Sequence, residues 1–475
     1  MAGNDIDILS IDRGLITAPA GCGKTHLIAD ALARHIDIKP ILVLTHTNAG
    51  VTALRGRLNH AGVSSNAYRI STIDGWSMRL ISTFPARSNY DLDILKLANP
   101  RVDYPNIRVA AAKLIMSGHV KDILTSSYAR LIVDEYQDCS IRQHQVVTSI
   151  AQILPTCVLG DPMQAIFGFG SDVLADWNKE VCAFFPLIGE LSTPWRWINS
   201  NSEPLGNWLL GVRRNLLCGE PINLKEAPSS VSWIELDGTD DHQQRLIAAR
   251  VQPPDGNSRI LIIGDSTNPA SQHQFASQTP GAITVEAVDL RDLVSFARTF
   301  DLAVADALER LVQFAHSVMI NVGAEELLRR IQSISQGTAH KPPTEVERAA
   351  LAFIHTPSYR SSVAMLSEIS KGNGVRAYRP AVLRACIKAL QLCGGSDNLS
   401  FYDAAIQVRE QNRYYGRSLP RRGVGSTLLL KGLEAEVVVV LNADVLDVRN
   451  LYVAMTRGSK ALTICSHSPV LNPKK

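Results

Sequence analysis

The sequence predicts an α/β fold with two domains, each built on a sheet of parallel strands. Short apolar runs alternate with helical segments in the first part of the chain, and a second alternating series begins near residue 231. A glycine-rich loop also joins the first apolar run to a helical stretch. Alternation of this kind is typical of parallel sheets that carry helices on both faces. A chain of 475 residues is long enough for about two to four domains and a large buried core.

Six apolar runs in the first part of the chain are predicted as strands. They are Leu15–Ala18, Ile41–His46, Tyr68–Thr72, Leu131–Glu135, Thr156–Asp161 and Ile188–Ser192. A loop of polar or small residues follows each run, and ligands of open α/β sheets bind at the carboxyl ends of the strands. We therefore expect a first domain at residues 1–193, with a small helical insertion at about 77–128.

The second series predicts a second α/β domain that is interrupted by a helical insertion. Its expected strands are Val231–Leu236, Arg259–Gly264, Ile283–Val288, Ser426–Leu430, Val437–Leu441 and Leu462–Cys465. The segment from Leu290 to Arg417 is mostly helical in pattern. The expected divisions are thus 194–289 for the first part of this domain, 290–417 for the insertion and 418–475 for the second part.

Composition restricts the class of protein. Hydrophobic residues make up 45% of the chain, charged residues 20%, and the net charge is only +3, so any nucleic-acid surface must be local. The eight cysteines are scattered without a C-x-x-C pair, which argues against a zinc or iron–sulfur site and fits reduced thiols. The first ten residues lack a secretory pattern, and no apolar run approaches a membrane span. We expect a cytoplasmic protein without a membrane partner.

A phosphate-binding loop is the most informative motif. Residues 18–25 read Ala18-Pro19-Ala20-Gly21-Cys22-Gly23-Lys24-Thr25, between a predicted strand and a helical stretch. Glycines permit close backbone approach, and the N–H groups at the start of a helix attract polyphosphate. Lys24 is expected to reach the β- and γ-phosphates, and the Thr25 hydroxyl to bind Mg²⁺. The alternative is a glycine-rich turn with a solvated lysine. We predict a nucleoside triphosphate site formed by residues Ala20, Gly21, Cys22, Gly23, Lys24 and Thr25.

A buried strand that ends in acids supplies the second motif. It reads Leu131-Ile132-Val133-Asp134-Glu135-Tyr136-Gln137-Asp138. Phosphoryl transfer to water needs one carboxylate to hold magnesium and another group to orient and deprotonate the water. Asp134 and Glu135 suit these two tasks. An exposed acidic turn is the alternative, and the phosphate-binding loop in the same chain argues against it.

Several further segments complete a resemblance to superfamily 1 helicases of the UvrD/Rep type. Besides the loop and the D-E-x-Q-D match at 134–138, they are Leu44-Thr45-His46-Thr47-Asn48, Ser71-Thr72-Ile73-Asp74-Gly75-Trp76, Gly160-Asp161-Pro162-Met163-Gln164-Ala165-Ile166-Phe167, Pro194-Trp195-Arg196, Lys431-Gly432-Leu433-Glu434 and Tyr452-Val453-Ala454-Met455-Thr456-Arg457. They occur in family order between residues 18 and 457. The resemblance implies two RecA-like P-loop domains and a DNA-dependent ATPase that moves on single-stranded DNA, 3′ to 5′.

The resemblance also implies roles for individual residues. Asp134 would hold Mg²⁺ through water, Glu135 would be the general base, and Gln164 would sense the γ-phosphate. Arg196 and Arg457 would act as arginine fingers delivered from the second domain, which would link hydrolysis to domain movement. The resemblance further implies nucleotide contacts from three residues outside the loop, namely Trp195, Gly432 and Glu434. The expected cofactors are ATP and Mg²⁺.

DNA contact is predicted from aromatic and polar residues of the same motifs. Single-strand binders stack bases on aromatic side chains at about 1–3 kcal/mol per base. Phe167 and Phe169 are expected to provide such a platform, and Trp76 is a further candidate. The alternative for each of them is a place in the hydrophobic core. Thr47, Asn48 and Arg57 are candidates for binding phosphates.

The chain departs from the family pattern in three respects. No glutamine precedes Lys24 to read adenine, although Trp195 is placed to stack on the base. Leu428 stands where the family has a histidine before K-G-L-E. Both inserted segments are short for the family, so we expect translocation with feeble unwinding by the isolated chain.

Two other functions compete with this interpretation. One is an ATP-hydrolysing sensor of DNA ends that regulates a partner nuclease, similar to the compact UvrD-like subunits of phage-defence systems such as Gabija. The other is an unrelated P-loop enzyme such as a small-molecule kinase. The kinase alternative leaves Gln137, Gln164, Arg196 and Arg457 without a common purpose. Co-purification of a nuclease and DNA-stimulated ATPase activity distinguish the three.

Overall fold

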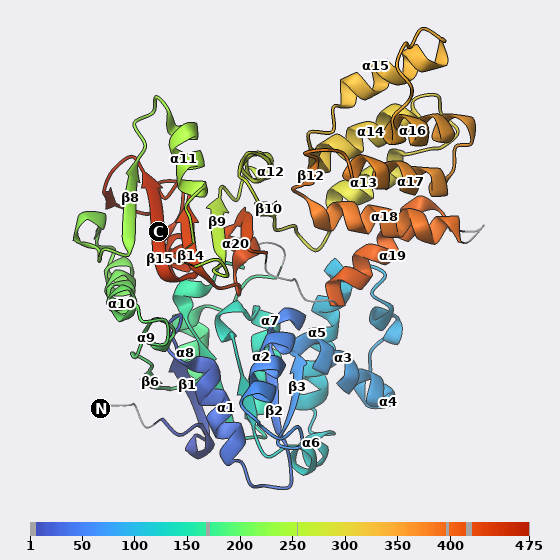
Figure 1. Ribbon diagram of the computed structural model, residues 1–475. Coiled ribbons are helices and arrows are strands. Elements are labelled where there is room, and N and C mark those ends of the chain that lie inside the picture. Colours follow the sequence, from blue (N-terminus) through green and yellow to red (C-terminus); the bar gives the residue numbers. More distant parts are fainter. Residues whose placement is uncertain (1–5, 168–171, 254, 396–398, 415–419, 475) are drawn as a thin grey trace. The chain divides into compact units, whose positions relative to one another are not determined.

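The chain forms two compact units (Figure 1). The computed structural model describes residues 6–167, 172–253, 255–395, 399–414 and 420–474. Unit 1 contains Met1–Trp233, Ala443–Leu462 and Ser468–Lys475, and unit 2 contains Ile234–Asn442 and Thr463–His467. The domain limits predicted from the sequence stay predictions.

Unit 1 is built on a six-stranded sheet with the order β3-β2-β4-β5-β1-β6. All of its neighbouring strands pair in parallel. The strands are β1 (Arg13–Thr17), β2 (Ile41–Thr45), β3 (Tyr68–Thr72), β4 (Leu131–Val133), β5 (Thr156–Gly160) and β6 (Leu187–Glu190). β2, β4 and β5 are buried along their whole length, as parallel strands covered on both faces must be. The α/β fold with parallel sheets is confirmed for this unit.

Helices cover both faces of this sheet because consecutive residues of each strand point to opposite sides. Ile16, Val43 and Ile132 pack in one buried core with α1 (Lys24–Arg34) and α2 (Asn48–His60). Leu15 and Leu44 pack in the other core, whose helices include α3 (Ile73–Thr83), α5 (Pro100–Met116) and α7 (Ile141–Ala151). The short helices α4 (Pro85–Ser88) and α6 (Lys121–Ser127) flank α5 in sequence.

The remaining helices and strands of unit 1 come from two stretches of the chain, residues 182–223 and residues 448–471. They are α8 (Cys182–Phe184), α9 (Trp195–Ile198), α10 (Glu203–Cys218), α21 (Val448–Met455), β7 (Ile222–Asn223) and β16 (Val470–Leu471). β7 and β16 pair in antiparallel orientation. The segment 443–462 therefore returns to the unit that holds the phosphate-binding loop.

A second six-stranded sheet has the order β10-β13-β9-β14-β15-β8. Its strands are β8 (Val231–Glu235), β9 (Ile260–Gly264), β10 (Ile283–Thr284), β13 (Arg422–Ser426), β14 (Ala435–Val440) and β15 (Gly458–Ser466). β10, β13, β9 and β14 pair in parallel. With α11 (Asp241–Ala249), α12 (Pro269–Gln278) and α20 (Thr427–Leu430), this sheet confirms a second α/β arrangement.

The prediction of a strand at Ser426–Leu430 is wrong for all but its first residue. β13 ends at Ser426, and residues 427–430 form α20. The Ser426 hydroxyl caps the N-terminus of this helix, where it accepts a hydrogen bond from the Leu429 N–H at 3.3 Å. Three consecutive leucines fit a buried helix as well as a strand, so periodicity alone does not separate the two.

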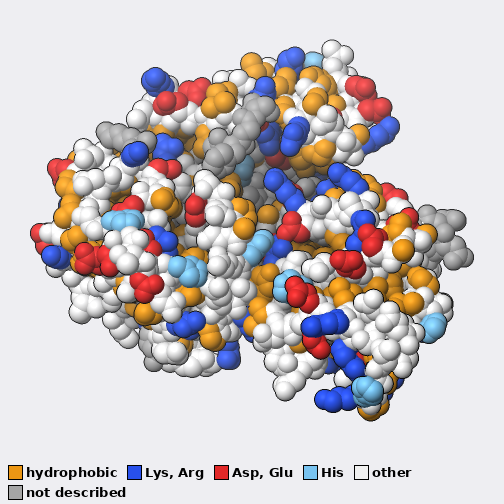
Figure 2. Space-filling model, turned by 90° about the horizontal axis from the view of Figure 1, so that it is seen from above, with side chains coloured by type: hydrophobic (Ala, Val, Ile, Leu, Met, Phe, Trp, Pro, Cys, Tyr) orange, Lys and Arg blue, Asp and Glu red, His pale blue; other side chains and the backbone are white. Residues whose placement is uncertain are grey.

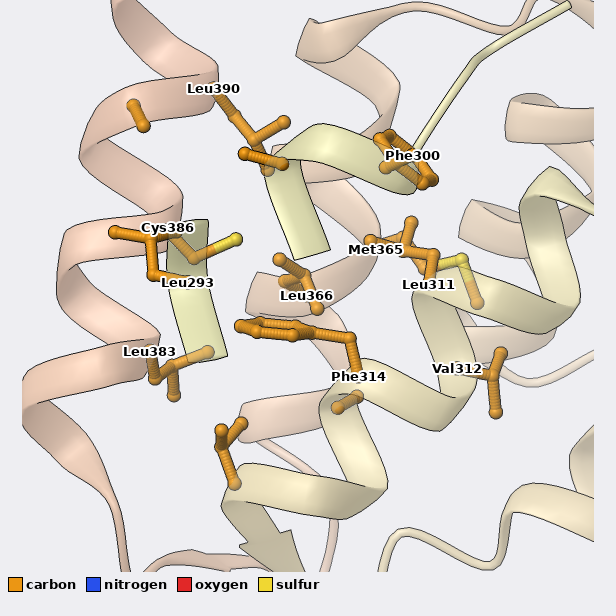
Figure 3. Packing of buried hydrophobic residues seen from close by; sticks show 14 of the residues in the cluster. Leu293, Phe300, Leu311, Val312, Phe314, Met365, Leu366, Leu383, Cys386 and Leu390 are labelled. Carbon is orange, nitrogen blue, oxygen red and sulfur yellow. The ribbon is translucent and has the colours of Figure 1, made fainter. Parts of the chain in front are cut away.

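The segment between the parts of this sheet is helical, as its pattern predicts. It contains α13 (Arg291–Thr299), α14 (Ala307–Val318), α15 (Ala324–Ser335), α16 (Glu345–His355), α17 (Tyr359–Ser370), α18 (Pro380–Gly394) and α19 (Phe401–Tyr414), with β11 (Met319–Ile320) and β12 (Arg376–Ala377) paired in antiparallel orientation. Figure 3 shows Phe314, Met365 and Leu366 among the side chains that meet between these helices. This segment thus has a hydrophobic core of its own.

Charge and hydropathy agree with the sequence analysis. Basic and acidic side chains are interspersed over the face shown in Figure 2, in keeping with a net charge of only +3. Among the described residues, no helix has both the length and the apolar character needed to cross a membrane.

Candidate nucleotide-binding and hydrolysis site

The phosphate-binding loop leaves the carboxyl end of β1 and turns into α1. Gly21 and Gly23 have φ angles of 71° and 89°, in the left-handed region that favours glycine. Among the described residues, the N–H groups of Gly21, Gly23, Lys24 and Thr25 have no hydrogen-bond acceptor. Free N–H groups at a helix N-terminus attract an anion, which the positive end of the helix dipole also favours. The loop is therefore shaped to receive phosphate groups.

Two tryptophans pack against the loop from α9. A Cβ atom on Gly21 would lie 2.5 Å from Trp197 Cζ3, and one on Gly23 would lie 2.9 Å from Trp195 Cδ1. Trp197 is buried and donates its indole N–H to the Gly458 carbonyl at 2.9 Å. Trp195 is 48% exposed, so part of its ring remains accessible beside the loop. Stacking of Trp195 on a nucleotide base stays a prediction.

Further contacts hold the loop backbone. The Ala20 N–H donates to the hydroxyl of Tyr452 on α21 at 3.2 Å, and the Arg196 N–H donates to the Gly21 carbonyl at 3.0 Å. Burial raises the pKa of Cys22 to about 12, with Asp161 adding to the shift. The Cys22 thiol therefore stays protonated at neutral pH and acts as a packing residue.

Lys24 lies between the two acids that follow β4. Its Nζ is 3.0 Å from Asp134 Oδ1 and also contacts Glu135 Oε1. Burial acts to lower the pKa of Lys24, but the two carboxylates outweigh burial and raise this pKa above its ordinary value. Burial raises the pKa of Asp134, although Lys24 opposes that shift. A triphosphate that binds the loop must therefore compete with these carboxylates for the lysine.

The donor atoms near the loop suit magnesium. The Thr25 hydroxyl and the carboxylate of Asp134 are hard oxygen ligands, the kind that Mg²⁺ prefers. No group of three or more His, Cys, Asp or Glu side chains able to hold a metal ion occurs in the described part of the chain. A magnesium ion here would need phosphate oxygens and water to complete its coordination, as is usual for this ion.

Glu135 has a strained backbone. Its φ is 55°, in the left-handed region that non-glycine residues rarely adopt. The Glu135 N–H donates to Asp134 Oδ1 at 2.9 Å, and the Glu135 carbonyl accepts from the Asp138 N–H at 3.1 Å. Such conformations cost about 1–3 kcal/mol and concentrate at functional sites. The strain supports a functional role for this carboxylate.

A chain of side-chain contacts runs from Lys24 to Arg457. Glu135 Oε2 accepts from Gln137 Nε2 at 2.5 Å, and Gln137 Oε1 accepts from the Asp161 N–H at 3.0 Å. Asp161 Oδ2 accepts from Gln164 Nε2 at 3.1 Å, and Gln164 Oε1 accepts from Arg457 Nη2 at 3.3 Å. All of these residues belong to unit 1. We call the series Lys24–Glu135–Gln137–Asp161–Gln164–Arg457 the polar relay.

Both predicted arginine fingers lie in unit 1, on segments that the sequence analysis assigned to a second domain. Arg457 is 4% exposed and also donates through Nε to the Val453 carbonyl at 3.0 Å. Arg196 donates through Nη1 to the Thr456 carbonyl at 2.6 Å, and its guanidinium lies 5.3 Å from the centre of the Trp197 ring. The two arginines thus meet at residue 456.

Arg213 is a site residue that the sequence analysis missed. This arginine of α10 is buried and donates to Asp161 Oδ1 through Nε at 3.2 Å and Nη2 at 3.1 Å. Through Nη1 it also contacts Glu190 at 2.6 Å. Arg213 follows Leu209 by four residues, on the apolar face of α10, and a charge at that position is the signal that was available.

The three residues predicted to bind DNA phosphates lie in different surroundings, at the start of α2 and beside the phosphate-binding loop. Thr47 begins α2, where its hydroxyl accepts from the Gly50 N–H at 3.0 Å, and Asn48 is the first helical residue. Arg57 Nη1 donates to Thr25 Oγ1 at 2.8 Å, so its guanidinium lies at the phosphate-binding loop. This contact is closer to the nucleotide site than the sequence analysis expected.

The aromatic residues predicted to stack on DNA bases also differ in their surroundings. Trp76 is 4% exposed and packs in the core with α5 and α7, the second of the two positions considered for it. The Phe167 ring lies 5.8 Å from the His46 ring, centre to centre. Phe169 lies outside the described residues. A stacking role for these side chains stays a prediction.

The K-G-L-E match belongs to unit 2. Gly432 has a φ of 81° and, with Glu434, lies in the turn between α20 and β14. The predicted part of these two residues in nucleotide binding stays a prediction.

Comparison with known proteins agrees with the loop and the acids. Residues 7–170 match the model of a family described as AAA domain, which covers the phosphate-binding loop, Asp134, Glu135 and Gln164. None of the curated proteins compared with the chain matches it.

One solved structure similar to the chain is the complex of Arterivirus nonstructural protein 10 (helicase) with DNA. The identity is 10% and the TM-score 0.28, over 54% of this chain and 48% of that chain. The alignment thus spans about half of the viral protein, and it adds nothing to the argument from the site. Residues 7–170 are thus similar to the AAA domain family, within an α/β architecture of two six-stranded sheets.

Proposed function

We propose that the protein is a DNA-dependent ATPase of the UvrD/Rep helicase type, which couples ATP hydrolysis to movement on single-stranded DNA in the 3′ to 5′ direction. The polar relay is the observation that carries this proposal. It connects the lysine of the phosphate-binding loop to the acids after β4, to Gln164 and to Arg457, through a direct contact at every step.

Each residue of the site has a distinct task in the proposed reaction. The free N–H groups of the loop and Lys24 bind the triphosphate, and Trp195 stacks on the base. Thr25 and Asp134 would hold Mg²⁺, which neutralises charge on the phosphate oxygens. Glu135 accepts a proton from the attacking water. When a γ-phosphate draws Lys24 away, the Glu135 carboxylate becomes available for that water.

In the proposed mechanism, the polar relay transmits the loss of the γ-phosphate to Arg457. Gln164 is hydrogen-bonded to Asp161 on one side and to Arg457 on the other. Loss of the γ-phosphate changes the partners available to Glu135 and hence to Gln137 and Asp161. Arg457 and Arg196 stabilise the charge that develops in the transition state, a contribution of about 10³–10⁵ in rate for arginine fingers. A rearrangement of this series would move the segment 452–458, and that movement would drive translocation.

The experiment that tests the proposal measures directed movement. Oligonucleotides carry biotin–streptavidin at either the 3′ or the 5′ end, and ATP-dependent displacement of streptavidin is followed. We expect faster displacement from the 5′ end, because a 3′ to 5′ motor runs toward it, and none with Lys24→Ala. Displacement from neither end, with ATPase activity intact, would contradict a motor.

The alternative of a sensor that regulates a nuclease predicts a different outcome. Such a protein hydrolyses ATP on DNA without displacing streptavidin, and it co-purifies with a nuclease. The same experiment therefore separates the two functions.

A further inference from the structure

A cavity lined by arginines lies at the edge of the sheet in unit 1. β3 ends the strand order, and within the described residues it pairs only with β2. The cavity has a volume of about 400 Å³ and is lined by residues of β3, α2 and α3 together with Leu42, Ser65 and Tyr128. Three arginines belong to the lining, Arg55, Arg69 and Arg79, and no lining residue is acidic.

The arginines reach this cavity from three consecutive elements. Arg55 follows the buried Leu54 on α2, Arg69 alternates with the buried Tyr68 on β3, and Arg79 precedes the buried Leu80 on α3. Arg69 is fixed in place, since its Nη1 donates to the carbonyls of Ser65 at 3.0 Å and Tyr68 at 2.9 Å. Its other N–H groups remain available for a ligand.

None of the three guanidinium groups pairs with a carboxylate in the described part of the chain. By contrast, two buried arginines of the chain pair with carboxylates, Arg213 with Asp161 and Arg379 with Glu286. A concave surface that carries several cations and no anion concentrates a positive potential. A guanidinium group can bind two oxygens of a phosphate at once, through two parallel hydrogen bonds.

The cavity is separate from the phosphate-binding loop. β3 and β1 are four strand positions apart in the order β3-β2-β4-β5-β1, a distance of about 19 Å at about 4.8 Å per strand. The lining residues include none of the loop and neither of the acids after β4. A nucleotide bound at the loop therefore does not fill this cavity.

We propose that this cavity binds a phosphate monoester on a small aromatic or sugar-bearing molecule, of the size of a mononucleotide. Its volume lies in the range of small-molecule sites, about 300–1,000 Å³. Arg55, Arg69 and Arg79 bind the phosphate, and Tyr68, Trp76 and Tyr128 supply the apolar wall. The same phosphate monoester occurs on a free nucleotide and on the 5′-phosphorylated end of a DNA strand.

The test compares binding to the full chain and to two variants by titration calorimetry. The double variant Arg55→Gln/Arg79→Gln removes two cations from the cavity, whereas Arg214→Gln, an exposed arginine of α10, is the matched control. The probes are AMP, a 5′-phosphorylated oligonucleotide and the same oligonucleotide with a 5′-hydroxyl. Circular dichroism confirms that all variants are folded.

We expect AMP to bind the wild type and the control equally, and the double variant about tenfold more weakly for each arginine removed. The KM for ATP hydrolysis should be the same in all three proteins, because the loop is untouched. If only the phosphorylated oligonucleotide shows this loss, the monoester comes from a strand end. Affinities for AMP and for the phosphorylated oligonucleotide that are both unchanged in the double variant, a raised KM for ATP, or an equal loss with the 5′-hydroxyl oligonucleotide would overturn the proposal.

Discussion

Replacement of Glu135 by glutamine separates nucleotide binding from hydrolysis. In the structure, one oxygen of Glu135 contacts Lys24 Nζ and the other accepts from Gln137 Nε2 at 2.5 Å. A glutamine keeps an amide oxygen for Lys24 but places an NH₂ group opposite the Gln137 donor. The change also leaves the backbone φ of 55° no less favourable, since both residues carry the same Cβ.

The magnitudes of the two effects differ enough to be distinguished. Loss of one charge-assisted hydrogen bond at this partly exposed side chain lowers the free energy of unfolding by about 1–2 kcal/mol. Loss of a general base slows hydrolysis by about 10²–10⁴-fold, which corresponds to about 3–5 kcal/mol of activation free energy. The variant should therefore stay folded and bind nucleotide while its turnover nearly disappears.

The assay combines equilibrium and single-turnover measurements on Glu135→Gln. A fluorescent ATP analogue reports affinity, and rapid quench with limiting ATP reports the rate of ATP cleavage on the protein. Glu203→Gln, an exposed glutamate at the start of α10, serves as the matched control and should behave as the wild type. Wild-type turnover in Glu135→Gln would refute its role as the base, and loss of nucleotide binding would assign it to the metal or the structure.

Four further outcomes are expected. Lys24→Ala should abolish hydrolysis in a steady-state phosphate-release assay, since no other loop side chain brings a positive charge to the phosphates; residual turnover near the wild-type value would exclude the loop as the active site. Arg457→Ala and Arg196→Ala should each slow hydrolysis by about 10³-fold or more with little change in DNA affinity at fixed salt, and weak DNA binding with normal turnover would place that arginine on the DNA surface instead. Burial lowers the pKa of His144 in the folded protein, so the unfolded chain binds a proton at this imidazole more tightly. The free energy of unfolding should therefore fall as pH drops below about 6.5. Urea unfolding should show a shallower fall with pH for His144→Gln than for the wild type, and an identical fall in the two proteins would contradict this. Phe167→Ala should raise the single-stranded DNA concentration needed for half-maximal ATPase, by a factor that corresponds to about 1–3 kcal/mol, whereas an unchanged concentration would assign the ring to the contact with His46 alone.

The sequence predicts the strands of unit 1 well because their burial is encoded locally. Residues 41–45 and 156–160 are continuous apolar runs bounded by polar or small residues, and each forms a strand buried along its whole length. The loop at 18–25 is equally local, because two glycines and a helix start define it. The second sheet is less regular, and its strand β13 gives way to α20 at a run of leucines that suits either structure.

The contacts of the site are not local, and periodicity carries no information about them. Gln164 and Arg457 are 293 residues apart in sequence, and their hydrogen bond depends on the return of the segment 443–462 to unit 1. Arg57 meets Thr25 because α1 and α2 pack on the same face of the sheet. Arg213 is hidden within an amphipathic helix, where a single cation does not reveal its partner.

A DNA-dependent motor hydrolyses ATP in response to a DNA strand, and steady-state ATPase activity with and without single-stranded DNA measures that response. The purified chain is titrated with an unstructured oligonucleotide at saturating ATP and Mg²⁺, and Lys24→Ala provides the background rate. We expect turnover to be low without DNA and to rise strongly to a plateau as the strand saturates the protein. Equal turnover at every DNA concentration, from a protein that hydrolyses ATP, would contradict a DNA-dependent motor.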